Sequence, residues 1–89
     1  MADYDVRFIE NAADEFKRLD PVVRRRVTRR LGWLRSNLDS IIPESLTGRL
    51  AGFYKLRVGN YRVVYEIVRT ERVIMIHAVG HRKDIYRRQ

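Results

Sequence analysis

The segment FYKLRVGNYRVVYEI, residues 53–67, constrains the fold of this 89-residue chain more than any other. Two runs of alternating apolar residues flank Gly59 and Asn60, which is the pattern of a β-hairpin closed by a two-residue turn. A two-residue turn fixes the strand register, so Val58 is expected opposite Tyr61. The same register assigns every side chain of both strands to one face of a sheet or to the other.

One face of the predicted hairpin is apolar and the other is basic. The apolar face, expected to lie under helices, carries Tyr54, Leu56, Val58, Tyr61, Val63, Tyr65 and Ile67. The other face carries Phe53, Lys55, Arg57, Arg62, Val64 and Glu66. Arg57 is expected directly opposite Arg62, and such a like-charge pair weakens a sheet by about 0.2–1 kcal/mol. A solvated face is one interpretation; a groove that binds phosphates and stacks bases on Phe53 and Val64 is the other.

Periodicity predicts one strand and two helices before the hairpin. Residues 4–9 alternate in the manner of a strand. Asn11 is the expected N-cap of a short helix over residues 12–19. Pro21 suits the first position of a second helix, whose apolar positions continue at helical spacing to Leu38. The two helices are expected to form a helical hairpin.

The remaining elements complete one small domain. An irregular connector over residues 39–52 leads into the hairpin strands, 53–58 and 61–68, and a third strand is expected over 73–79. Gly80 is expected to end that strand, before a short C-terminal turn or helix. The order βααβββ predicts a single α+β domain, residues 1 to 89, with an antiparallel sheet covered on one face by the helical hairpin.

The third strand brings further basic residues to the hairpin. A turn at 69–72 would pair Val64 with His77 and Arg62 with Val79. The C-terminal segment would then emerge beside Arg62, and a concave basic site would result. The predicted members of this site are Lys55, Arg57, Arg62, Arg82 and Tyr86.

Composition narrows the class of partner. The chain has 19 Lys and Arg against 11 Asp and Glu, so its formal net charge is +8. A field of that sign attracts nucleic acid, an anionic membrane surface or an acidic protein, and arginine suits bidentate contact with phosphate. No apolar run approaches the length of a membrane span, and the N-terminus does not read as a signal peptide. With no cysteine and two histidines, we expect neither disulfides nor a metal site.

The sequence resembles the RelE family of toxins, within the RelE/ParE superfamily of type II toxin–antitoxin systems. The most specific stretches are YKLRVGNYRVVY and VGHRKDIY, and the resemblance runs from YDVRF near the start to IYRR near the end. It implies a cytoplasmic, ribosome-dependent endoribonuclease, an mRNA interferase that cuts mRNA in the ribosomal A site and so inhibits translation. The ribose 2′-hydroxyl would attack the adjacent phosphate, with neither metal nor cofactor. The resemblance also implies a cognate acidic antitoxin, RelB-like, as partner.

The resemblance carries active-site roles onto the basic face. The family's functional positions fall on Lys55, Arg57, Arg62, Arg82 and Tyr86. The arginines suit stabilisation of phosphate charge, but Arg57 stands where some relatives have the lysine that is the presumed base, and arginine does not readily deprotonate. Lys55 is therefore the candidate base, because neighbouring cations would favour its neutral amine. His81 is the second candidate acid or base, because histidine titrates nearest neutrality.

The second predicted helix carries a run of arginines with two interpretations. These residues are Arg24, Arg25, Arg26, Arg29 and Arg30. They form either a solvated helix face or a contact with ribosomal RNA phosphates, and adjacent arginines favour the RNA contact. Two other functions stay open: a ParE-like inhibitor of DNA gyrase, and an RNA-binding module without catalysis.

Overall fold

The computed structural model describes residues 3–86 and has the predicted α+β class. Its elements are β1 (Asp5–Phe8), α1 (Glu10–Lys17), α2 (Pro21–Asn37), the 3-10 turn η1 (Leu38–Ser40), β2 (Glu44–Ser45), the 3-10 turn η2 (Gly48–Leu50), β3 (Tyr54–Val58), β4 (Tyr61–Val68) and β5 (Val73–His81). Within the described part of the chain, no helix is both long and apolar enough to cross a membrane.

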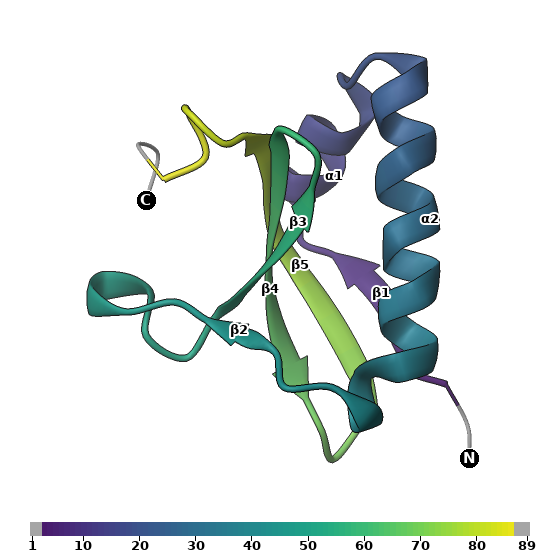
Figure 1. Ribbon diagram of the computed structural model, residues 1–89, viewed down its shortest axis with the longest axis vertical. Helices are drawn as coiled ribbons and strands as arrows, with labels where there is room; N and C mark the ends of the chain where they lie inside the picture. The colour runs from purple at the N-terminus through teal and green to yellow at the C-terminus, as the bar shows by residue number, and fades with distance from the viewer. Residues whose placement is uncertain (1–2, 87–89) are drawn as a thin grey trace.

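The sheet has five strands in the order β1-β5-β4-β3-β2. In Figure 1, α2 stands on one side of the sheet, while the C-terminal segment and the loop around η2 lie on the other. The expectation of a wholly antiparallel sheet is wrong at one edge, because β1 pairs with β5 in parallel. The helical pair, rather than a tight turn, links β1 to the rest of the sheet, so no hairpin forces the antiparallel direction there. The short strand β2 forms within the connector that was expected to be irregular.

The hairpin has the predicted register. Val58 lies opposite Tyr61, and Arg57 lies opposite Arg62. Gly59 has a φ of 58°, the left-handed conformation that a tight turn of this kind requires of its first residue. Local turn chemistry was therefore sufficient to place the like-charge pair.

The pairing of β4 with β5 departs from the prediction by one residue. The two strands start as expected, but a β-bulge between Val64 and Tyr65 shifts the register. Val64 therefore lies opposite Ala78 rather than His77, and Arg62 lies opposite Gly80 rather than Val79. A bulge adds one unpaired residue to a strand, and sequence alternation does not reveal it.

Boundaries of the first helix and of the last strand also differ from the prediction. The first helix begins at Glu10 rather than residue 12, with Ile9 as its N-cap and no side-chain capping bond, so Asn11 lies inside the first turn. The Ile9 amide donates to the Ile76 carbonyl, so the chain leaves the sheet directly into the helix. Gly80 does not end the last strand, which continues to His81.

The main core lies between the helices and the predicted apolar face of the hairpin. The fully buried side chains include Val27 and Leu34 of α2 and Val63, Tyr65, Ile74 and Ile76 of the sheet. Each such apolar side chain contributes about 1.5–3 kcal/mol relative to exposure. Burial raises the pKa of Tyr65 to about 12, so its phenol stays neutral. This packing commits one face of the sheet to the helices and leaves the opposite face for the basic residues.

Candidate active site

The basic side chains of the hairpin lie in two rows across the sheet face that the helices leave uncovered. One row runs from Glu44 through Lys55 and Val64 to Ala78. The next row, one step nearer the hairpin turn, comprises Arg57, Arg62 and Gly80. The predicted site residues Lys55, Arg57 and Arg62 are therefore neighbours on adjacent strands.

Glu44 binds two of these cations, and sequence reasoning missed it. Its carboxylate accepts two bonds from the Arg57 guanidinium, at 3.3 Å and 3.1 Å, and lies 3.1 Å from Lys55 Nζ. Hydrogen bonds from Arg57 and then Lys55 lower the pKa of Glu44, and the same contact raises the pKa of Arg57. From the sequence, only cations were expected around Lys55, but its ammonium group lies beside the Glu44 carboxylate. No periodicity signals Glu44, because β2 is only two residues long.

The hairpin turn positions the other two arginines. Arg62 Nη1 donates to the carbonyls of Gly59 and Tyr61, both at 2.8 Å. The backbone amide of Arg82 donates to the Asn60 carbonyl, also at 2.8 Å. The chain after β5 is therefore anchored beside Arg62, as the sequence predicted.

The C-terminal turn is held down by Ile85. This side chain is fully buried and packs with Val64 and Ala78 in a second, smaller apolar cluster. A Cβ on Gly80 would lie 3.3 Å from Ile85 Cδ1, so the glycine permits the close approach. The next residue, Tyr86, is 37% exposed.

This packing overturns one expectation about the basic face. Val64 is only 1% exposed, and Phe53 packs against the same cluster and stands edge-on to His77, with ring centroids 4.8 Å apart. Neither residue forms the open groove for stacked bases that the hairpin pattern indicated. Apolar residues on that face serve instead to dock the C-terminal turn.

We expect Ile85→Ala to release the C-terminal turn without unfolding the domain. Ile85 belongs to the small cluster rather than the main core, so its loss acts locally. Trypsin should then cleave after Arg82 and Lys83 in the variant faster than in the parent, as read by mass spectrometry. Equal cleavage rates would show that Ile85 does not anchor the segment.

The structure does not bring His81 to this site. His81 pairs with Tyr61, whose ring lies edge-on to the imidazole at a centroid distance of 5.4 Å. Tyr61 packs against the helix-side core, so both side chains lie on the face opposite Arg62. The imidazole Nδ1 lies 3.2 Å from the Lys83 amide, which donates to it. His81 is therefore placed as part of the turn and away from the basic rows.

The arginines of α2 do not form one uniform surface. Arg24 donates to the carbonyls of Lys17 and Leu19, both at 3.2 Å, and so caps the end of α1. Arg30 Nε donates to the Arg57 carbonyl at 3.3 Å and ties α2 to β3. Arg25, Arg26 and Arg29 are exposed. At least two of the five predicted phosphate ligands thus have structural contacts of their own.

Comparison with known proteins identifies the family of the chain. Residues 6–86 match the family described as ParE toxin of type II toxin-antitoxin system, parDE. The chain is a type II toxin of the RelE/ParE superfamily. Toxin RelG of Mycobacterium tuberculosis is 33% identical over 85 residues, which cover 96% of this chain and 98% of RelG. A putative RelE-like toxin protein of Escherichia coli is 30% identical over 87 residues, covering 93% and 90% of the two chains.

Solved structures of RelE toxins share the fold. A chain of the RelBE2 toxin–antitoxin complex from M. tuberculosis superposes with a TM-score of 0.81 at 30% identity, covering 94% of this chain and 97% of that one. The isolated E. coli RelE toxin superposes with a TM-score of 0.72 at 28% identity, covering 88% and 83%. Membership of the RelE side of the superfamily therefore has support from both sequence and structure.

Proposed function

We propose that this toxin is a ribosome-dependent mRNA endoribonuclease. The observation that carries the proposal is the convergence of Lys55, Arg57 and Arg62 with the anchored C-terminal turn on one uncovered sheet face. The likeness to RelE toxins supports it. In this cytoplasmic reaction, the 2′-hydroxyl of one nucleotide attacks the adjacent phosphate and expels the 5′-oxygen of the next nucleotide. The products are a 2′,3′-cyclic phosphate and a 5′-hydroxyl, whose oxygen takes up a proton from water as it leaves.

The side chains divide the chemistry of that step. The guanidinium groups of Arg57, Arg62 and Arg82 stabilise the charge on the pentavalent phosphate. Tyr86, exposed directly after the buried Ile85, orients the phosphate or stacks on a base. The proton of the 2′-hydroxyl needs an acceptor, and Glu44 is the carboxylate that lies within the cluster, 3.1 Å from both Lys55 Nζ and Arg57 Nη2. The Lys55 ammonium beside Glu44 then serves as the cation that holds this carboxylate in place.

The exposure of the site explains why a ribosome would be required. The side chains of Arg57 and Glu44 are 61% and 45% exposed, so the protein encloses little of its substrate. In-line attack requires a fixed substrate geometry, and positioning of reactants lowers a barrier substantially. Exposed arginines of α2, such as Arg26 beside the hairpin turn, would contact ribosomal RNA phosphates.

Primer extension on translated and untranslated copies of one mRNA tests the proposal. We expect codon-aligned cuts in the translated copy only. A ParE-like inhibitor is the second candidate, because the matching family description is that of ParE toxins. Accumulation of gyrase–DNA cleavage complexes without RNA cuts would favour that activity. RNA binding without either signal would favour the module without catalysis.

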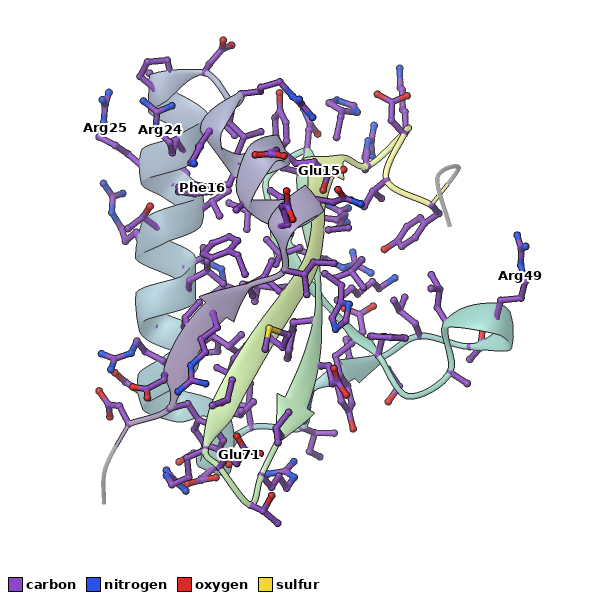
Figure 2. All side chains as sticks on the ribbon, turned by 180° about the vertical axis from the view of Figure 1, so that it is seen from behind. Glu15, Phe16, Arg24, Arg25, Arg49 and Glu71 are labelled. Carbon is purple, nitrogen blue, oxygen red and sulfur yellow. The ribbon has the colours of Figure 1, made fainter. Side chains whose placement is uncertain are left out.

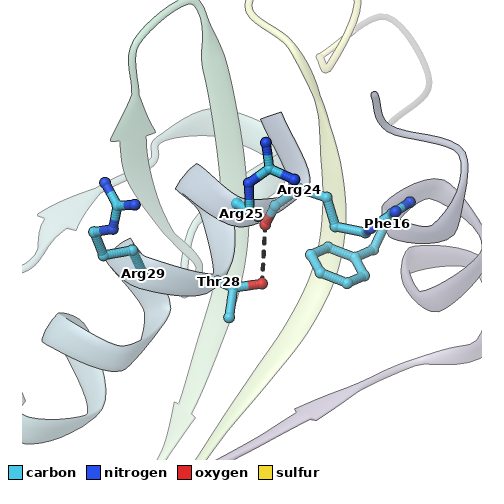
Figure 3. A pocket seen from close by; sticks show the side chains of 5 residues that line it. All are labelled: Phe16, Arg24, Arg25, Thr28 and Arg29. Atoms are coloured by element: carbon cyan, nitrogen blue, oxygen red, sulfur yellow. Dashed lines mark hydrogen bonds between the residues drawn. The ribbon is translucent and has the colours of Figure 1, made fainter. Parts of the chain in front are cut away.

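We also propose an acidic antitoxin partner that docks on the helical hairpin and the adjoining sheet edge. Structures similar to this one include RelB–RelE complexes. Two neighbouring surface pockets, of about 480 Å³ and 390 Å³, share Phe16 and Thr28 as lining residues. The first is rimmed by Arg24, Arg25 and Arg29 (Figure 3). The second is lined by apolar side chains of β1 and α2. An apolar floor with a basic rim suits an acidic amphipathic segment.

Charge reversal at this rim should weaken antitoxin binding. We expect the double variant Arg25→Glu and Arg29→Glu to lower the affinity for the acidic protein encoded by the adjoining reading frame by about tenfold, because steering and rim pairs depend on charge complementarity. Surface plasmon resonance measures this affinity. Arg49→Glu, on the η2 loop away from the rim (Figure 2), is the control for charge alone and is compared with each single rim variant, which changes the net charge by the same amount. Equal loss in Arg49→Glu and in a single rim variant would show that net charge, not this rim, determines binding.

A further inference from the structure

A separate groove lies beside β3, on the side of α2. Its volume is about 240 Å³, and its walls come from α2, from the segment before β2 and from β3. β2 pairs only with Tyr54 and Lys55, so the later part of β3 has an uncovered edge at which the groove opens. The volume is below the range of about 300–1,000 Å³ that is usual for drug-sized ligands, and it suits one flat group rather than an extended molecule.

The groove presents exposed apolar surface beside cations. Trp33 is 41% exposed and Ile42 is 97% exposed, and both line the groove, so they form exposed apolar surface at one place. The Arg30 guanidinium lies over the Trp33 ring, 4.6 Å from its centroid. Because Arg30 also donates to the Arg57 carbonyl, it links the indole to the strand that carries the candidate active site.

The charges around the groove favour an anionic ligand. Arg30, Lys55 and Arg57 line it together with a single carboxylate, Glu44, which Lys55 and Arg57 already neutralise. An excess of positive charge beside an exposed aromatic ring is the combination that binds single-stranded nucleic acid, since the ring stacks on a base and the cations follow the phosphates. An acidic protein would also be attracted to the cations, but its binding would not require an aromatic ring with a cation above it.

We propose that Trp33 is a stacking platform for one unpaired base of the RNA, with Arg30 beside the adjoining phosphate. Lys55 and Arg57 line this groove and also form the candidate active site, so one strand of RNA can extend from the site around the edge of β3 to Trp33. The platform rests on the proposed function for the class of its ligand, RNA. It adds a binding position outside the cleaved bond, one that selects unpaired nucleotides.

Trp33 is the only tryptophan of the chain, so its fluorescence reports this position directly. The probe is a 2′-O-methyl RNA hexamer, which carries no free 2′-hydroxyl and is not cut. We expect saturable quenching by the hexamer, and little quenching by an abasic hexamer of equal charge or by inorganic phosphate. Binding of the 2′-O-methyl hexamer without any change in fluorescence would overturn the platform.

Substitutions separate stacking from charge. We expect Trp33→Ala to weaken hexamer binding, measured by fluorescence polarisation, about tenfold, which lies within the usual effect of removing one base-stacking aromatic ring. Trp33→Phe should retain most of the affinity. Val22→Ala, an exposed apolar position of the same helix, is the matched control and should bind as the parent does. Equal hexamer binding by Trp33→Ala and the parent would refute the site.

Two further outcomes distinguish the RNA platform from a protein-docking surface and from the proposed nuclease function. If Trp33→Ala leaves hexamer binding unchanged and weakens only the acidic partner protein, the groove is a protein-docking surface and the RNA platform is overturned. If Trp33→Ala weakens hexamer binding while the parent protein makes no cuts in translated mRNA, the platform stands and the proposed nuclease function fails. The measurements on free protein need no ribosome, so the two failures are distinguishable.

Discussion

Replacing Arg82 with alanine is expected to abolish growth inhibition while leaving the domain folded. The Arg82 backbone is anchored to the hairpin turn beside Arg62, and its side chain is exposed and free to meet a phosphate bound there. Removing one group that stabilises charge in a transition state typically costs about 10²–10³ in rate. Cells expressing the variant should therefore grow as cells without the toxin do.

The control for this experiment is Arg7→Ala. Arg7 is an exposed arginine of β1, at the far edge of the sheet, and its loss changes net charge by the same amount. Circular dichroism and thermal unfolding should be unchanged in both variants, because neither side chain is buried. Full toxicity of a folded Arg82→Ala protein would remove Arg82 from the proposed machinery.

The second large effect is expected at Glu44. We expect Glu44→Gln to lower the rate of cleavage on programmed ribosomes by about 10²–10⁴, the usual contribution of one general base. RNA binding should be equal or tighter, because the substitution frees Lys55 and Arg57 from a competing carboxylate. Opposite changes in binding and cleavage would distinguish a proton acceptor from a group that only holds the site together.

Glu66→Gln is the matched control for Glu44. Glu66 is a comparably exposed carboxylate on the same face of the sheet, where it pairs with His77 at 2.9 Å rather than with the basic rows. Its substitution should leave cleavage unchanged. Parallel losses of cleavage and of RNA binding in Glu44→Gln would instead mean that Glu44 positions Lys55 and Arg57 and that the proton goes elsewhere.

Local patterns in the sequence were sufficient for the hairpin and for the basic residues on it. A turn of two residues admits one register, so Arg57 opposite Arg62 followed from the chain alone. The helical spacing of the apolar residues after Pro21 likewise predicted α2 from the sequence alone. Both features depend on residues close together in the chain, where steric and periodic rules apply directly.

Tertiary structure alone decided which other groups join the site. Glu44 reaches Lys55 because a two-residue strand pairs at the sheet edge, and His81 faces away because of its place in the β5 ladder. The bulge beside Val64 and the burial of Ile85 depend in the same way on packing between distant segments. Such contacts are selected by the shape and free energy of the whole domain, and no short window of sequence encodes them. Local rules therefore placed Lys55, Arg57 and Arg62 on one face of the hairpin. Pairing between distant segments supplied their carboxylate partner, Glu44, and the C-terminal turn that packs on the same face through Ile85.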